Sequence, residues 1–122
     1  MRVLYVEDNQ QLRESITMLL QSEGRLVSAC VNAEDALALD ASEPFDLVIT
    51  DVTLPGMSGL EFSARLLSAD AARQIIVCSG YQLDREIGEL GGRNVRTLVK
   101  PFGIDELESV LDRVEASLSS ER

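Results

Sequence analysis

Hydrophobic and polar positions follow the same pattern five times along the chain. Each round opens with a short apolar run, and such runs are typical of strands that are buried on both faces of a sheet. The runs occupy residues 3–6, 25–30, a segment that ends at 50–51, 75–79 and 95–99. After each run the sequence turns to apolar residues at helical spacing or to a segment of helical tendency. The pattern therefore predicts five strands that alternate with five helices.

Capping signals mark several of the predicted helix ends. Gly24 supplies a stop after the first helical segment. Asn32 with Asp35 begins a short, alanine-rich second helix. Ser58 and Glu61 form a capping box, which makes the start of the third helix the best specified in the chain.

The last two predicted helices differ in strength. The segment 82–90 contains Gly88 and runs into two further glycines, so we expect a short fourth helix. The fifth is strongly amphipathic, and its apolar stripe is predicted to pack on the sheet. That stripe consists of Ile104, Leu107, Val110, Leu111, Val114 and Leu118.

Strict alternation of strands and helices predicts the fold class. It is typical of an α/β protein with a parallel sheet, right-handed crossovers and helices on both faces. The chain has 122 residues, which suits one domain around one core, and no linker or low-complexity tract divides it. We therefore expect a single domain over residues 1–122.

Composition narrows the functional classes. The formal net charge is −10 and histidine is absent, which argues against direct nucleic-acid binding and removes every histidine-based mechanism. Cys30 and Cys78 lie within predicted strands without a CxxC pattern, so we expect two reduced, buried thiols. The first apolar run is too short for a signal sequence or a membrane span. A soluble, cytoplasmic protein is the expectation.

Polar side chains stand at the ends of four predicted strands. Glu7 and Asp8 follow the first strand, Asp51 ends the third, Ser79 ends the fourth, and Lys100 follows the fifth. In a parallel sheet the carboxyl ends of the strands share one edge, where open α/β sheets bind their ligands. These residues are therefore predicted to converge, although they are far apart in sequence.

Each of these residues alone has an ordinary explanation, whereas together they form a chemical unit. Asp8 with Gln11 could cap the first helix, Ser79 could start a turn, and a lone lysine is usually solvated. Carboxylates that lie close together repel one another, and a hard cation such as Mg²⁺ would relieve that repulsion. With Mg²⁺ held by Asp8 and Asp51, one oxygen of Asp51 remains free to attack phosphorus, while Lys100 and Ser79 hold the phosphoryl oxygens.

These motifs resemble the response-regulator receiver domain of two-component signalling, in order and spacing over essentially the whole chain. The matching motifs are Glu7-Asp8, Asp51 followed by Leu54-Pro55-Gly56-Met57-Ser58-Gly59, Ser79-Gly80, and Lys100-Pro101-Phe102. The resemblance implies a flavodoxin-like, doubly wound (βα)5 fold with a five-stranded sheet in the order 2-1-3-4-5.

The resemblance also implies roles for individual residues. Asp51 would be the phosphoacceptor, and the expected Mg²⁺ ligands are Glu7, Asp8, Asp51 and the backbone carbonyl of Thr53. Ser79 would be the switch hydroxyl that moves to the phosphoryl group, and Lys100 would be its counter-ion. The family further implies a cis peptide bond between Lys100 and Pro101.

Three positions bear on how such a receiver would signal. Receivers usually carry Tyr or Phe three residues before the lysine, where this chain has Thr97, so the usual aromatic switch cannot operate as such. Either Thr97 reorients and the short fourth helix moves, or the output uses another surface. Thr53 and Tyr81 would flank the path of the hydrolytic water and make autodephosphorylation slow, unless Tyr81 is only a surface aromatic.

Other functions compete with this interpretation. An aspartyl phosphatase would need a second aspartate at position 53, where the chain has Thr53, and a flavin module would need a phosphate loop where the acidic Glu7-Asp8 pair stands. A receiver-shaped adaptor that is never phosphorylated is the serious alternative.

The signalling interpretation carries its own expectations about partners. It predicts no enzyme in the ordinary sense, a monomer, and a histidine kinase or phosphotransfer protein as donor. A downstream output protein or domain would receive the signal, and the chain would be either a stand-alone receiver or a piece of a larger protein such as a hybrid histidine kinase.

Overall fold

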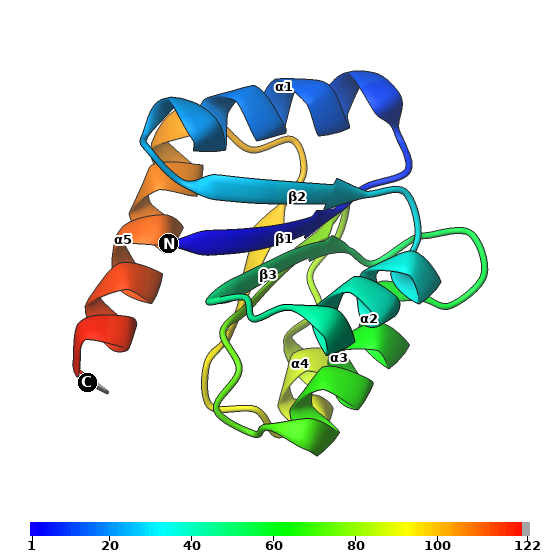
Figure 1. Cartoon of the computed structure of the whole chain (residues 1–122). Coiled ribbons are helices and arrows are strands. Elements are labelled where there is room, and N and C mark those ends of the chain that lie inside the picture. Colours follow the sequence, from blue (N-terminus) through cyan, green and yellow to red (C-terminus); the bar gives the residue numbers. More distant parts are fainter. Residues whose placement is uncertain (121–122) are drawn as a thin grey trace.

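A computed structural model of the chain describes residues 1–120 and shows one parallel sheet between two helical layers (Figure 1). The strands are β1 (Arg2–Val6), β2 (Leu26–Cys30), β3 (Leu47–Asp51), β4 (Ile75–Ser79) and β5 (Val95–Val99). The helices are α1 (Gln10–Ser22), α2 (Ala33–Ser42), α3 (Gly59–Ala69), α4 (Asp84–Leu90) and α5 (Ile104–Ser120). The strand order is β2-β1-β3-β4-β5 and every pair is parallel, which confirms the expected flavodoxin-like fold.

Two apolar layers hold the helices on the sheet. Helices α1 and α5 cover one face, where Leu20 and Leu111 pack against strand residues such as Ile49. Helices α2, α3 and α4 cover the other face, and the fully buried Phe62 lies in that layer. Because alternate residues of each strand point to opposite faces and helices cover both faces, strands β3 and β4 are buried along their whole length, as the sequence pattern predicts.

The predicted caps are present. The side chain of Asn32 accepts a hydrogen bond from the Asp35 amide at 2.7 Å, and that of Ser58 accepts one from the Glu61 amide at 3.1 Å. Gly24 has a φ of +81°, a backbone conformation that favours glycine. Helix α4 has only 7 residues and lacks a side-chain cap, so the expected short fourth helix is confirmed.

Two expectations need correction, and one alternative explanation is excluded. Helix α1 is capped by Asn9, whose side chain accepts from the Leu12 amide at 2.9 Å, so Asp8 is not the cap. Ile104 is 60% exposed because the apolar stripe of α5 meets the core only from Leu107 onward. Cys78 is buried, whereas Cys30 is only partly buried because β2 is an edge strand; both thiols are free.

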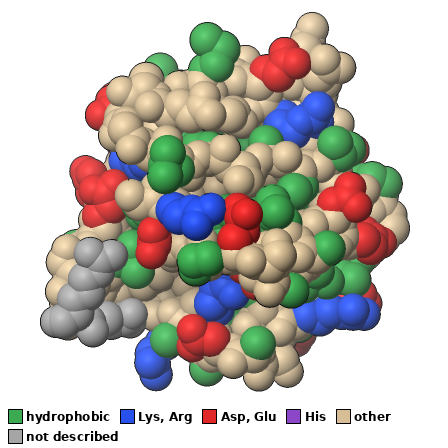
Figure 2. Space-filling model, viewed as in Figure 1, with side chains coloured by type: hydrophobic (Ala, Val, Ile, Leu, Met, Phe, Trp, Pro, Cys, Tyr) green, Lys and Arg blue, Asp and Glu red, His purple; other side chains and the backbone are tan. Residues whose placement is uncertain are grey.

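The surface is mixed in character. In the view of Figure 2, apolar side chains are interspersed with Lys, Arg, Asp and Glu. The exposed large apolar residues are Met18, Leu26, Val31, Tyr81 and Ile104. Within residues 1–120, no helix combines the length and the apolar character that crossing a membrane requires.

Candidate functional site

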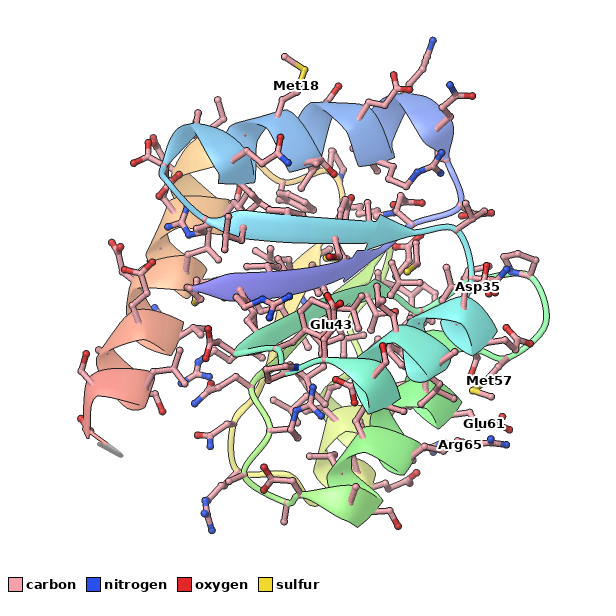
Figure 3. The ribbon with its side chains drawn as sticks, in the orientation of Figure 1. Met18, Asp35, Glu43, Met57, Glu61 and Arg65 are labelled. Carbon is pink, nitrogen blue, oxygen red and sulfur yellow. The ribbon has the colours of Figure 1, made fainter. Side chains whose placement is uncertain are left out.

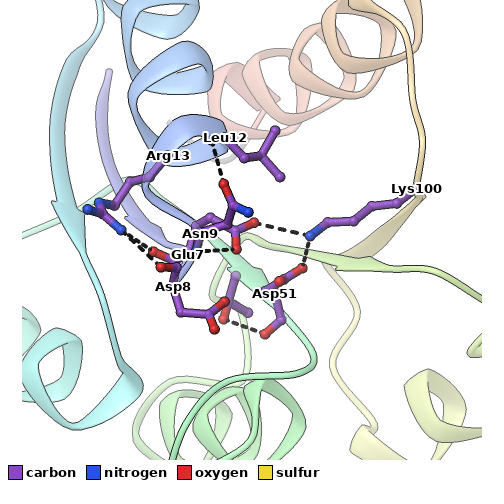
Figure 4. Close-up of polar contacts among 8 residues, drawn as sticks. Glu7, Asp8, Asn9, Leu12, Arg13, Asp51 and Lys100 are labelled. Atoms are coloured by element: carbon purple, nitrogen blue, oxygen red, sulfur yellow. Dashed lines mark hydrogen bonds and ion pairs between the residues drawn. The ribbon is translucent and has the colours of Figure 1, made fainter.

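The carboxyl ends of β1, β3, β4 and β5 meet at one edge of the sheet. The strand register aligns Val6 with Thr50, Asp51 with Cys78, and Ser79 with Val99, so the residues at or just beyond these positions lie at the same level. The loops that follow the strands carry Glu7, Asp8 and Lys100 to the same edge (Figure 4). The predicted convergence of the site residues is therefore present.

Three carboxylates form the centre of the site. Glu7, Asp8 and Asp51 each offer one oxygen, and these three oxygens lie within 4.8 Å of one another. Glu7 is 2% exposed and Asp51 8% exposed, whereas Asp8 faces solvent. Carboxylate oxygens grouped in this way are the donors that Mg²⁺ prefers in proteins, so the donor set suits that ion.

Lys100 pairs with two of the three acids. Its Nζ lies 2.6 Å from Oδ1 of Asp51 and 3.1 Å from Oε1 of Glu7. Burial lowers the pKa of the Lys100 ammonium, but its hydrogen bonds to Asp51 and Glu7 outweigh burial and raise the pKa above its usual value. Lys100 therefore stays protonated and supplies a fixed positive charge beside Asp51.

Glu7 has both of its carboxylate oxygens engaged. Oε2 accepts a hydrogen bond from the Asn9 amide at 3.1 Å, and Oε1 accepts from Lys100. Burial raises the pKa of Glu7, and these two hydrogen bonds oppose that effect. Glu7 thus joins Asn9, the N-cap residue of α1, to the lysine of the β5–α5 loop.

Asp8 is held by its backbone and leaves its carboxylate available. Nη1 of Arg13 donates to the carbonyl oxygens of Glu7 at 2.9 Å and of Asp8 at 3.4 Å (Figure 4). Among the described residues, no cation forms an ion pair with the Asp8 carboxylate. Sequence reasoning missed Arg13 and Asn9; the Asn9 cap had a sequence signal, an asparagine just before a helical pattern.

The loop that follows Asp51 is held at both ends by backbone hydrogen bonds. The Val52 amide donates to the Cys78 carbonyl at 2.9 Å, and the Gly59 amide donates to the Val52 carbonyl at 2.8 Å. A Cβ on Gly59 would lie 1.9 Å from the backbone oxygen of Asp51, so α3 begins directly against Asp51. Thr53 lies on the exposed part of this loop, two residues after Asp51.

Ser79 lies at the predicted edge, and its hydroxyl bonds to its own loop. Oγ donates to the Tyr81 carbonyl at 2.8 Å and accepts from the Tyr81 amide at 3.0 Å. The Tyr81 side chain is exposed. The structure thus brings Ser79 to the strand ends but shows its hydroxyl engaged with Tyr81 rather than with Asp51.

Thr97 lies outside the acidic cluster. It is half-buried on β5 and lines an open hollow of about 590 Å³ together with residues of α5, among them Asp105, Val110 and Arg113. The Lys100-Pro101 peptide bond is cis, as the resemblance implied.

Comparison with known proteins agrees with this geometry. The family model of the response regulator receiver domain matches residues 3–112. The transcriptional regulatory protein HprR of Escherichia coli is 33% identical over 118 residues, which cover 97% of this chain and 52% of HprR. The chain spans about half the length of the first curated relatives that it matches.

Solved structures of response regulators share the fold and part of the sequence, and two of them illustrate the similarity. The chemotaxis response regulator CheY4 of Vibrio cholerae is 30% identical with a TM-score of 0.83, and the match covers 93% of this chain and 97% of that one. The response regulator TrrA of Thermotoga maritima is 32% identical with a TM-score of 0.82 and the same coverage. The TrrA structure is a complex with Mg²⁺-BeF.

Proposed function

Because the chain belongs to the response-regulator receiver family, we propose that it accepts a phosphoryl group on Asp51 from a phosphohistidine of a kinase or phosphotransfer protein. The observation that carries this proposal is the contact of 2.6 Å between Lys100 Nζ and the Asp51 carboxylate, beside two further acids. The pair supplies a nucleophilic oxygen and a fixed positive charge at one place.

The metal proposed for this site is Mg²⁺. Its expected ligands are Glu7, Asp8, Asp51 and the carbonyl of Thr53, and the bound ion would neutralise the acids and the incoming phosphoryl oxygens. Asp8 is the most available of the three acids, since it is exposed and unpaired among the described residues. The Mg²⁺-BeF complex of TrrA, a relative, supports this assignment.

The proposed transfer needs one bond to form and one to break. An oxygen of Asp51 forms a bond to phosphorus as the bond between phosphorus and the donor imidazole nitrogen breaks, and that nitrogen keeps the electron pair. The Lys100 ammonium stabilises negative charge on the phosphoryl oxygens. Ser79 has the hydroxyl that would donate a hydrogen bond to the same group.

The hydrogen bonds of Ser79 suggest how the signal would leave the site. To donate a hydrogen bond to a phosphoryl group, its Oγ must release the hydrogen bond that it donates to the Tyr81 carbonyl, and this loss would loosen the β4–α4 loop. The adjoining α4 has no buried residue and no side-chain cap, which makes it easy to displace. We propose that α4, rather than an aromatic at position 97, carries the change to partner proteins.

Phosphorylation is tested on the intact chain. Incubation with acetyl phosphate and Mg²⁺, followed by intact-mass measurement, should show one phosphoryl adduct on the wild type and on the control Asp105→Asn. The variant Asp51→Asn should show none. If the wild type formed no adduct under any condition, the proposal would be wrong and the phosphorylation-independent adaptor would be the better description.

We further propose that the acyl phosphate is long-lived because Thr53 and Tyr81 restrict access of water to it. Both residues lie two positions beyond a site residue, and both are exposed at the edge of the site. Decay of the phosphorylated chain should be faster in Tyr81→Ala than in the wild type, when followed by mass spectrometry. Equal decay rates would remove this role for Tyr81.

A further inference from the structure

The loop of residues 52–58 carries Thr53 and connects Asp51 to α3, and its outer half is largely exposed. Val52 and Leu54 are buried in the core, whereas Thr53, Pro55, Gly56 and Ser58 are exposed. The outer half is held by a residue from a different element. Glu34, in the first turn of α2, accepts a hydrogen bond at its Oε2 from the Met57 amide at 3.1 Å.

The carboxylate of Glu34 also lies directly over the backbone of Gly56. A Cβ built on Gly56 would be 2.5 Å from Oε2, 3.3 Å from Cδ and 3.4 Å from Oε1 of Glu34. Gly56 has a φ of +75°, a backbone conformation that favours glycine. The absence of a Cβ at this position also leaves room for the Glu34 carboxylate. Figure 3 shows Met57 beside the end of α2 that carries Asp35.

We propose that Glu34 is a positioning residue for the acceptor loop. By holding residues 56 and 57, it fixes the loop that presents Asp51 and the carbonyl of Thr53 to a metal ion. This inference rests on the proposed function, because it concerns the same Mg²⁺ site. Glu34 itself touches neither the acids nor the reacting atoms.

The position of Glu34 suits this task physically. A hydrogen bond from a backbone amide to a charged carboxylate is stronger than one between neutral groups. A negative charge in the first turn of a helix also interacts favourably with the helix dipole. The carboxylate therefore bridges the N-terminus of one helix and the loop that precedes another.

The simpler explanation is that Glu34 only stabilises α2 through that dipole. Asp35 provides the matched control, because it is an exposed acid in the same turn of α2. Among the described residues, the hydrogen bond from the loop goes to Glu34 and not to the Asp35 side chain. The variant Glu34→Gln separates charge from hydrogen bonding, since glutamine keeps an oxygen that can accept from the Met57 amide.

The experiment compares the full chain with Glu34→Ala, Glu34→Gln and Asp35→Ala. Amide hydrogen exchange of Met57 is measured by NMR without metal, and Mg²⁺ affinity is measured by calorimetry. In Glu34→Ala, Met57 should exchange about fivefold faster, which corresponds to the loss of one typical hydrogen bond. The Kd for Mg²⁺ should rise on the order of tenfold, as for other residues that orient metal ligands.

The controls decide between the explanations. Glu34→Gln should restore most of the Met57 protection and the Mg²⁺ affinity, and Asp35→Ala should match the wild type. Wild-type exchange and affinity in Glu34→Ala, or equal losses in Asp35→Ala, would overturn the positioning role. A wild-type chain that bound no Mg²⁺ would overturn the proposed function instead, whereas the exchange of Met57 would still test the contact with Glu34.

Discussion

Replacing Asp8 by asparagine should stabilise the metal-free chain. Three carboxylate oxygens lie within 4.8 Å of one another, while Lys100 pairs with Glu7 and Asp51 only. The carboxylate of Asp8 is therefore repelled by two other carboxylates, and among the described residues it has no ion-pair partner. The asparagine of Asp8→Asn would keep the size of the side chain and remove its charge, so repulsion should fall while packing stays the same.

The expected size follows from the geometry of the cluster. Two unit charges at a separation of 4.8 Å repel by roughly 1 kcal/mol in water and by roughly 3 kcal/mol at an effective dielectric constant of about 20. Because Asp8 is exposed and Lys100 offsets part of the field, the lower value applies, about 1 kcal/mol. For a chain of this length, that free energy raises the melting temperature by roughly 4 °C.

Thermal unfolding followed by circular dichroism measures this effect, first in EDTA and then with Mg²⁺. Asp8→Asn should melt above the wild type in EDTA, and Mg²⁺ should raise the melting temperature of the wild type by more than that of the variant. Asp112→Asn, an exposed acid of α5 outside the cluster, controls for the change in net charge. If Asp8→Asn melted at or below the wild type in EDTA, the acids would not repel as described.

Three further predictions concern stability. Phe62→Ala should cost about 4 kcal/mol in urea unfolding, because Phe62 is fully buried between α3 and the sheet, and a cost below about 2 kcal/mol would contradict that packing. Burial raises the pKa of Cys78 from 9.0 to about 12, so the folded state retains a proton that the unfolded chain releases above pH 9. The free energy of unfolding should therefore fall between pH 9 and 12, and it should fall less in Cys78→Ala. Equal falls in the two proteins would refute the role of Cys78. Glu115→Ala should lower the free energy of unfolding by about 2 kcal/mol, because Glu115 is the only described ion-pair partner of Arg25, whose side chain is 7% exposed. The control Glu108→Ala should lower it much less. Equal losses in the two variants would refute the pairing.

Much of the fold could be predicted from the sequence because local and long-range signals agree. Strands β4 and β5 have the predicted bounds, since each is a short run of strand-forming residues followed by a polar or turn-forming residue. Once the sheet is parallel, its topology alone brings Asp51 and Lys100 to one edge. Asp51 and Lys100 could therefore be grouped before any distance was known.

Other features depend on tertiary geometry that periodicity does not encode. Helical spacing places Ile104 on the apolar stripe but does not show where α5 first meets the core. The contact between Glu34 and Met57 joins residues 23 positions apart, and it requires the path of the loop and one particular side-chain conformation. Likewise, the hydrogen bonds between the Ser79 hydroxyl and the Tyr81 backbone have no signal in the sequence.

The contact between Gly59 and Asp51 has a consequence for the mutational tolerance of the chain. Any side chain at position 59 would place its first carbon 1.9 Å from the backbone oxygen of Asp51, so every other residue type must displace either α3 or Asp51. A Cβ at Gly80 or Gly88 would meet nothing within 4 Å, so these glycines can vary. Substitution is therefore sterically blocked at the glycine beside Asp51, whereas the two glycines on either side of the start of α4 leave space for a side chain.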